Sequence, residues 1–308
     1  MRDPKTGVYF YEKCLEISRL TNDRRGEMAS NHDLGLIYQS MGEAVAASKY
    51  HERHLELATK DAIPSEEQTA ARELVKVYQK IAEEREGEGD HDEAVFFYQK
   101  TLESAVLAME RQSEGLANYR LGRAYVMLGE CHRAVQFLED YEVICKELDD
   151  REGEGQACSA MAAAYQALSN DEKALTYLKS CLDIASETEN LVTQGEACCA
   201  LGVIYNKRGE YDKAVDYFER NFEIARTVAS TGAAETKTHM RQLETRFRAT
   251  PFAPKATRVD RGPENVGARK MLQEELNVDV QMGVSHGATV ESIINNASIM
   301  VRKARIHA

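Results

Sequence analysis

The sequence predicts an all-α fold, a right-handed superhelical solenoid of antiparallel helix pairs with a partly irregular C-terminal tail. Three observations favour this fold. A motif resembling Leu-Gly-x-x-Tyr recurs five times in the 308 residues, and small and aromatic residues follow it at constant distances. The composition, 43% hydrophobic and 29% charged, is rich enough to bury a core. A repeated helix pair buries its apolar face only by stacking on its neighbours.

The motif occurs as LGLIY, LVKVY, LGRAY, MAAAY and LGVIY, with spacings of 40, 47, 40 and 40 residues. These stretches end at Tyr38, Tyr78, Tyr125, Tyr165 and Tyr205. Nine residues after four of the tyrosines comes an alanine, at Ala47, Ala134, Ala174 and Ala214. Three residues further comes an aromatic side chain, at Tyr50, Phe137, Tyr177 and Tyr217. Such constant offsets predict one supersecondary unit per repeat.

Each part of the motif has a physical reason. Leu34 and Tyr38 are four residues apart, so they share one face of a helix. Gly35 lets the second helix of the pair approach closely, and Ala47 does the same from that second helix. The aromatic residue is expected to fill the space between neighbouring repeats. A glycine four residues after the tyrosine marks the end of the first helix, at Gly42, Gly129 and Gly209.

The second repeat fits this pattern only when seven residues are removed between Tyr78 and Ala94. The extra segment lies within KIAEEREGEGDHDE. Because seven residues make about two helical turns, we expect the insertion to lengthen the first helix and to keep its buried face.

The anchors set the boundaries of the repeats. VYFYEKCLEIS matches a second helix, so residues 1–20 are expected to form half a repeat. Five helix pairs are predicted at 21–60, 61–107, 108–147, 148–187 and 188–227. Either the sequence is truncated before this half repeat, which is the interpretation we favour here, or a partner covers the exposed end.

The C-terminal part departs from the repeat. Residues 228–248 are predicted to form a solubilising end helix, and residues 249–267, with three of the five prolines, a linker. Residues 268–308 form a basic tail, in which 287–305 have the spacing of an amphipathic helix. That helix docks on the stack, binds a partner or is disordered alone. Its expected contact residues are Arg302, Lys303 and Arg305.

Charge and composition exclude several classes of function. The net charge of −12 disfavours nucleic-acid binding, which needs a basic surface. The charge is uneven, because residues 246–308 carry +4 and the remainder −16. No apolar run reaches the roughly 20 residues of a membrane span, and no secretory signal is recognisable. The seven cysteines include no CxxC, which favours reduced thiols of a cytoplasmic protein.

No catalytic motif is present, so the sequence predicts no enzyme, no catalytic residue, no cofactor, no metal and no small-molecule substrate. P-loop, GxSxG and HExxH patterns are all missing. His51 and His54, three residues apart, share a helix face as metal ligands would. No carboxylate or cysteine completes such a set, and we expect them to be surface histidines of a second helix. Recognition of other proteins remains as the expected function.

Leu-Gly-x-x-Tyr followed by alanine nine residues later resembles the tetratricopeptide repeat. In that family the first helix of each pair lines a concave groove, which implies groove positions six and two residues before the tyrosine and one after it. These triplets are His32, Leu36, Gln39; Arg72, Lys76, Gln79; Tyr119, Arg123, Val126; Ser159, Ala163, Gln166; and Cys199, Val203, Asn206.

Two features of this implied groove are candidate binding elements. Amides at Gln39, Gln79, Gln166 and Asn206 form a row that either hydrogen-bonds an extended peptide or simply faces solvent. Tyr119 lies beside a basic spot. That spot either clamps carboxylates of an acidic partner or forms ordinary ion pairs with residues such as Glu73. It consists of Arg72, Lys76 and Arg123.

The 40-residue period, as in NLVTQGEACCALGVIYNKRGEYDKAVDYFERNFEIA, resembles a long-repeat subclass that includes Pins-type adaptors, kinesin light chains and rapsyn. The Pins-type asparagine ladder is missing, since Leu36, Lys76 and Arg123 occupy its positions. YFYEKCLEISRLTNDRRGEMASNHDLGLIYQSMG is similar to a ciliary member of the subclass. That resemblance implies a structural subunit of the cytoskeleton, associated with inner dynein arms of the axoneme and needed for ciliary beating. The alternative is a soluble cytoplasmic adaptor for an acidic segment of a cargo, chaperone or spindle-orientation partner.

Overall fold

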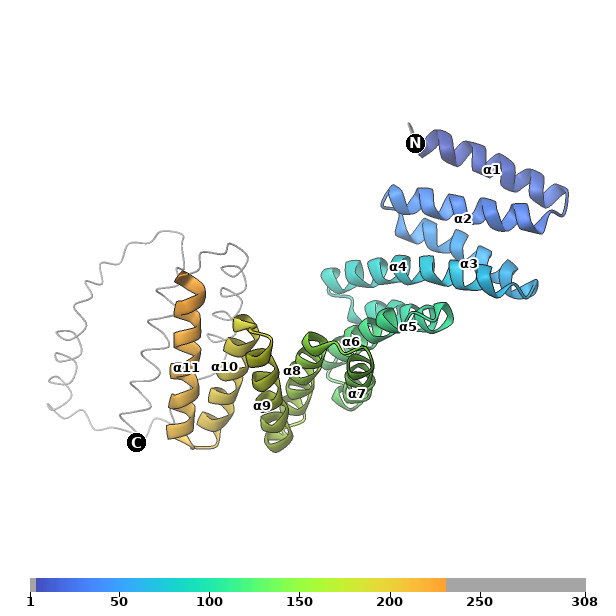
Figure 1. The fold of residues 1–308 in the computed structure, drawn as a ribbon. Coiled ribbons are helices and arrows are strands. Elements are labelled where there is room, and N and C mark those ends of the chain that lie inside the picture. The colour runs from blue at the N-terminus through green and yellow to red at the C-terminus, as the bar shows by residue number, and fades with distance from the viewer. Residues whose placement is uncertain (1–3, 231–308) are drawn as a thin grey trace, which may run out of the picture. The chain divides into compact units, whose positions relative to one another are not determined.

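The computed structural model describes residues 4–230, which form eleven α-helices and no strand (Figure 1). The helices are α1 (Pro4–Leu20), α2 (Arg24–Ser40), α3 (Ala44–Lys60), α4 (Pro64–Glu88), α5 (His91–Ala108), α6 (Arg111–Met127), α7 (Cys131–Glu147), α8 (Arg151–Ala167), α9 (Asp171–Glu187), α10 (Leu191–Lys207) and α11 (Tyr211–Ser230). The predicted all-α repeat fold is confirmed. None of these helices has the length and apolarity that crossing a bilayer requires.

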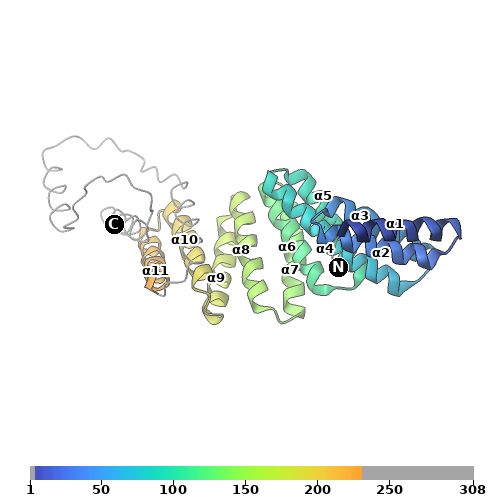
Figure 2. The same ribbon diagram turned by 90° about the horizontal axis from the view of Figure 1, so that it is seen from above.

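The described part of the chain divides into two compact units, with the boundary between Thr193 and Gln194, inside α10. In the first unit, each helix from α1 to α9 packs on its neighbours in sequence wherever both lie within that unit. The two helices of a pair, such as α6 and α7, lie side by side in both views (Figures 1 and 2). The first helix of each pair is called helix A below, and the second helix B. The predicted end helix beyond residue 230, the linker and the tail lie outside the described residues.

Local signals mark the two ends of the helices, and the predicted glycines follow helix A. Side chains at several N-termini accept a hydrogen bond from the backbone N–H three residues on, at Asp23, Asp90, Asp150 and Asn170. Three glycines after helix A adopt φ of +82°, +78° and +78°, at Gly42, Gly129 and Gly209. That left-handed backbone reverses the chain at little steric cost, because glycine has no Cβ.

The glycine of the motif makes the predicted close approach between the two helices of a pair. A Cβ added at Gly122 would lie 2.5 Å from Leu138, and one at Gly202 would lie 2.6 Å from Phe218. Gly35 meets His51 in the same way. The aromatic residue of helix B stacks on the tyrosine of its own pair, at centroid distances of 5.3 to 5.6 Å. The four stacked pairs are Tyr38–Tyr50, Tyr125–Phe137, Tyr165–Tyr177 and Tyr205–Tyr217.

The insertion lengthens α4 to 25 residues, against 17 in α2, α6 and α8, which confirms the predicted longer helix A. Toward the preceding pair, α4 keeps the repeat register. The Tyr78 hydroxyl donates a hydrogen bond to Glu52, 26 residues earlier, at 2.7 Å. Likewise, the Tyr125 hydroxyl accepts a 2.8 Å bond from Gln99, also 26 residues earlier.

On the side of α4 that packs against α5, its own helix B, the contacts are shifted by two helical turns relative to the other pairs. In the first pair, Gln39 contacts His51, 12 residues on, at 3.2 Å. In the second pair, the contact across 12 residues joins Glu86 to Tyr98 at 2.7 Å. Glu86 lies seven residues beyond Gln79, the repeat equivalent of Gln39. Helix α5 is therefore displaced along α4 by about 10 Å, while the same face of α4 stays buried.

Candidate protein-binding face

Each helix A turns one row of side chains outward, at the position two residues before the motif tyrosine. Four of these residues are exposed, and Val203 in the second unit is half-buried. The exposed four are Leu36, Lys76, Arg123 and Ala163. In the first unit, the four exposed residues and the residues four before and three after each of them are called the helix-A face. The assignment of this row to partner contact stays a prediction.

The predicted amide row is half-buried, in contrast to the exposed row beside it. All four members, Gln39, Gln79, Gln166 and Asn206, have intermediate exposure. The Nε2 atom of Gln39 lies 3.3 Å from Glu73 Oε2, 3.5 Å from the Glu73 carbonyl and 3.2 Å from His51 Nε2. Gln39 is thus held between α2, α3 and α4, so it does not simply face solvent.

Glu73 fixes the orientation of the Gln39 amide. Two oxygens of Glu73 face the Gln39 nitrogen, and both can only accept, so the nitrogen must donate to them. His51 Nε2 faces the same NH₂ group and therefore accepts, which puts the imidazole proton on Nδ1. The Gln39 carbonyl oxygen has no hydrogen-bond partner among the described residues, so it remains an acceptor for a ligand.

Gln79 repeats this arrangement one pair later. Its Nε2 atom donates a 3.0 Å hydrogen bond to Glu83 Oε1 on the same helix. Its carbonyl oxygen, too, is unused by the described residues. Two members of the row therefore offer acceptors, and the partner groups that fit them are donors such as backbone N–H groups.

The basic spot is largely neutralised. Arg72 Nε lies 3.3 Å from Glu110, and Lys76 Nζ lies 2.8 Å from Glu73. Arg123 is exposed, and its guanidinium lies over the Tyr119 ring at 5.7 Å from the centroid. Among the described residues, Arg123 has no carboxylate partner. Arg123 is therefore the member of the spot whose charge stays available to a partner.

Tyr119 holds the guanidinium of Arg123 over the face of its ring. Its ring is half-buried and packs against Tyr141 of α7, with centroids 5.0 Å apart. It also contacts the buried cluster of Tyr141, Cys145 and Ala157. A ring anchored in this way presents its face to the guanidinium, an attractive cation–π geometry.

His51 and His54 are buried, so the expectation of surface histidines was wrong. Their exposed fractions are 0% and 1%. His51 fills the space beside Gly35, and His54 lies three residues further along α3. His54 Nε2 lies 2.9 Å from Glu66 Oε2. Burial lowers the pKa of His51 to about 4 and lowers that of His54. Within residues 4–230, no group of three or more His, Cys, Asp and Glu is placed to hold a metal ion.

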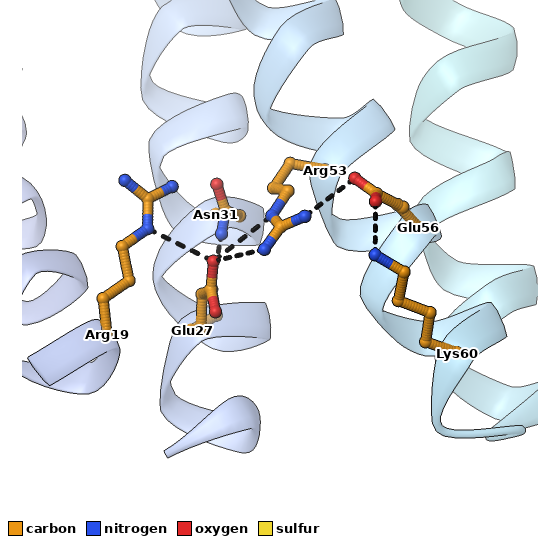
Figure 3. A network of polar contacts seen from close by, with 6 residues as sticks. All are labelled: Arg19, Glu27, Asn31, Arg53, Glu56 and Lys60. Carbon is orange, nitrogen blue, oxygen red and sulfur yellow. Dashed lines mark hydrogen bonds and ion pairs between the residues drawn. The ribbon is translucent and has the colours of Figure 1, made fainter. Parts of the chain in front are cut away.

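A polar network joins α1, α2 and α3 (Figure 3). Glu27 is buried and accepts hydrogen bonds from Arg19 Nε at 3.2 Å and from Arg53 Nε and Nη2 at 3.2 and 3.0 Å. Asn31 donates to the Glu27 backbone carbonyl at 2.7 Å. The network ties the half repeat α1 to the first full pair.

The network continues along α3 to the surface. Glu56 accepts from Arg53 Nη1 at 2.8 Å and from Lys60 Nζ at 2.6 Å. Hydrogen bonds and charge from Lys60 and Arg53 lower the pKa of Glu56 to about 2. This carboxylate therefore stays ionised throughout the neutral range.

Sequence reasoning missed Glu73, Glu83 and His51 as partners of the amide row. Glu83 lies four residues after Gln79, a helical spacing that signals contact. For His51 the signal was its place in the repeat, where Leu138 and Phe218 are buried in other pairs. Arg302, Lys303 and Arg305, the predicted tail contacts, lie outside the described residues.

The repeats match a known family. Residues 32–65 and residues 154–227 each match a tetratricopeptide repeat family. The chain therefore carries tetratricopeptide repeats, a class of helix-pair scaffold for protein interactions, and the predicted repeat class is confirmed.

Curated relatives share one name. The chain is 29% identical over 150 residues to tetratricopeptide repeat protein 29 of Macaca fascicularis, covering 46% of this chain and 31% of that protein. It is 29% identical over 133 residues to the protein of the same name from Trypanosoma brucei brucei, covering 43% and 26%. The Rattus norvegicus protein is 34% identical over 129 residues, covering 40% and 27%. The chain thus spans under a third of the length of these relatives.

Solved structures resemble the chain more distantly. BtubC from P. vanneervenii aligns with a TM-score of 0.49 at 16% identity, covering 75% of this chain and 93% of that chain. A signal-transduction ATPase with a tetratricopeptide repeat sensor, from Pyrococcus horikoshii, gives the same TM-score and identity, covering 78% and 40%.

Proposed function

We propose that this chain is a non-catalytic scaffold that binds other proteins through its helix-A face. The observation that carries this proposal is the combination of an outward row with two half-buried amides, Gln39 and Gln79, whose nitrogens Glu73 and Glu83 already engage. Preoriented acceptors favour a polypeptide, which offers backbone N–H donors at regular intervals. Proteins, rather than nucleic acid, membrane or small molecules, are the proposed partners.

Within that function we propose a structural role in the axoneme of cilia and flagella, associated with dynein arms and needed for motility. Support comes from the resemblance of residues 9–42 to a ciliary member of the long-repeat subclass. The similarity to proteins named tetratricopeptide repeat protein 29 supports it further. The corresponding location is the cytoskeleton of the cytoplasm.

The test is to tag the protein in a ciliated cell and to extract isolated cilia with detergent and then with high salt. Retention after detergent and release by high salt is the expected result, because electrostatic contacts weaken as salt screens charge. Absence from cilia would discard the axonemal role and leave the binding function to be tested separately.

Arg123 favours a second candidate, a soluble cytoplasmic adaptor for an acidic segment of a cargo, chaperone or spindle-orientation partner. Its guanidinium is exposed, held over Tyr119 and without a carboxylate partner among the described residues. Acidic peptides are predicted to lose most of their affinity in an Arg72→Glu, Arg123→Glu double variant. Lys179→Glu, an exposed charge reversal on helix B, is the control. Unchanged binding in the double variant would reject the clamp.

A further inference from the structure

A groove opens on the side of the molecule formed by helices B, between α3 and α5. Its volume is about 360 Å³. Its floor is Leu74 and Tyr78 of α4. The walls are Glu52, Leu55 and Glu56 of α3 and Lys100, Glu103, Ser104 and Leu107 of α5. None of these residues belongs to the helix-A face, so the groove is a separate feature.

This groove differs from the equivalent regions of the other repeats in two ways. The two-turn shift moves α5 along α4, so the wall opposite α3 is made by a different part of the helix. In addition, Ser104 stands at the helix-B position that carries a large aliphatic residue in every other pair. Those residues are Leu57, Ile144, Ile184 and Ile224. The small Ser104 side chain leaves space that an aliphatic residue would occupy.

The α5 wall is also unusually apolar for a surface. Phe96 is 51% exposed and Leu107 is 40% exposed. Phe96, Lys100, Glu103 and Leu107 are spaced by four, three and four residues, so they form one stripe along α5. The other pairs have polar residues at both apolar positions. The equivalents of Phe96 are Lys49, Gln136, Thr176 and Asp216, and those of Leu107 are Lys60, Glu147, Glu187 and Thr227.

The charges of the groove are arranged around this stripe. Lys100 Nζ lies 3.7 Å from Glu52 and over the rings of Tyr78 and Phe96, at 5.1 and 5.2 Å from their centroids. Glu52 is therefore paired with Lys100, and Glu56 forms ion pairs with Arg53 and Lys60. Glu103 is exposed and forms no ion pair with a described residue. With three carboxylates and one ammonium, the lining residues sum to −2.

We propose that this groove binds an amphipathic segment of a partner protein that carries large apolar side chains beside Lys or Arg. The apolar side chains would cover Leu107, Phe96 and the floor, where Ser104 leaves room for them. The basic side chain would pair with Glu103. Segments of this kind bind hydrophobic grooves between helices, with the charges at the rim setting their orientation. The proposal goes beyond the helix-A face and does not depend on it.

The test uses the full chain and two fluorescent synthetic peptides of about five helical turns. One peptide places Leu on one face and Lys on the other, and the second places Glu where the first has Lys. Affinity is measured by fluorescence anisotropy at physiological salt. The wild-type chain is expected to bind the Leu/Lys peptide, and the Leu/Glu peptide at least about tenfold more weakly.

Four variants locate the binding. Ser104→Leu restores the aliphatic residue of the first pair, and Phe96→Lys restores the residue of α3, so each is expected to weaken binding by about tenfold. Glu103→Lys is expected to weaken it by about fivefold. Asp183→Lys is the matched control, because Asp183 occupies the position of Glu103 two pairs later and is also exposed. It should leave the affinity unchanged.

The other outcomes overturn the proposal. Equal affinity in wild type and all groove variants, with circular dichroism showing folded protein, would place binding elsewhere. A preference for the Leu/Glu peptide would contradict the charge assignment. Self-association by light scattering that Phe96→Lys abolishes would make a second copy the occupant. Variants of the helix-A face leave the groove intact, so the two functions fail independently.

Discussion

The first helix pair, α2 and α3, and the third, α6 and α7, solve the same packing problem with different chemistry. In both, a motif glycine brings the helices close. The side chain that meets it is His51 at Gly35 in the first pair and Leu138 at Gly122 in the third. Three residues later, His54 is buried in the first pair where the third has an aromatic ring. The geometry of the repeat thus specifies the size of the side chain that packs against the motif glycine, and it accepts either a polar or an apolar residue there.

The buried histidines of the first pair need hydrogen-bond partners, whereas Leu138 of the third pair needs none. Gln39 contacts Nε2 of His51, and Glu66 contacts Nε2 of His54. The Nδ1 atoms of both histidines, and that of His32, are buried without a hydrogen-bond partner. A buried polar atom without a partner costs on the order of 1–3 kcal/mol. The first pair is therefore expected to be less stable than the third, and the predictions at Leu138 and His51 test this comparison.

The largest expected loss of stability comes from creating a cavity in the third pair. Leu138 is fully buried, so Leu138→Ala should lower the free energy of unfolding by about 2–5 kcal/mol. Urea unfolding followed by circular dichroism measures it. A loss below about 1 kcal/mol would mean that α7 collapses into the space and that the close packing at Gly122 is not rigid.

Overpacking at a motif glycine should cost somewhat less. A Cβ at Gly202 would lie 2.6 Å from the Phe218 ring, so Gly202→Leu should destabilise the α10–α11 pair by about 1–3 kcal/mol. The matched control is Gly87→Leu in α4, because a Cβ there meets nothing within 4 Å. Equal melting temperatures for these two variants would contradict the packing assignment.

Acid should weaken the first pair specifically. The pKa of His51 is about 4 in the folded chain and about 6.5 when unfolded, so the unfolded state binds more protons between these values. Stability is therefore complete above pH 6.5 and is lost as pH falls toward 4. At pH 5 the loss is about 2 kcal/mol.

His51→Leu gives the first pair the filler of the third and should remove this loss. The variant's stability relative to wild type should rise by about 2 kcal/mol between pH 7 and pH 5 in urea unfolding. Glu73, His32, His54 and Lys76 face His51 and remain in both proteins, which makes the difference specific to residue 51. Parallel pH profiles would show that His51 does not titrate with folding.

The smallest expected effect is an increase in stability. Gly87 lies inside helix α4 with open space around its Cα, so Gly87→Ala should stabilise the chain by about 0.5–1 kcal/mol. A rise in the urea midpoint without a change in slope would show it. A decrease instead would indicate that the end of α4 needs the flexibility of glycine.

Much of the fold could be predicted from the sequence, because the motif reports positions within a helix. Spacing alone identified Gly42, Gly129 and Gly209 as helix ends and located the longer α4. The burial of His51 was missed because histidine has no strong preference for core or surface, although Leu138 and Phe218 are buried at the equivalent position of other pairs. The pairing of Gln39 with Glu73 depends on how α4 meets α2, and no motif records that contact. The groove at Ser104 required comparison of equivalent positions once the two-turn shift was known.

The same shift limits how this chain can change in length. Helix α4 meets α3 in one register and α5 in another, and the two differ by seven residues. Removing or adding a single residue between Tyr78 and Glu86 would rotate everything after it by about 100° about the helix axis. Removing seven would return α5 to the ordinary 40-residue spacing with its buried face intact. We therefore expect this part of the gene to tolerate insertions and deletions of seven codons better than those of one or two.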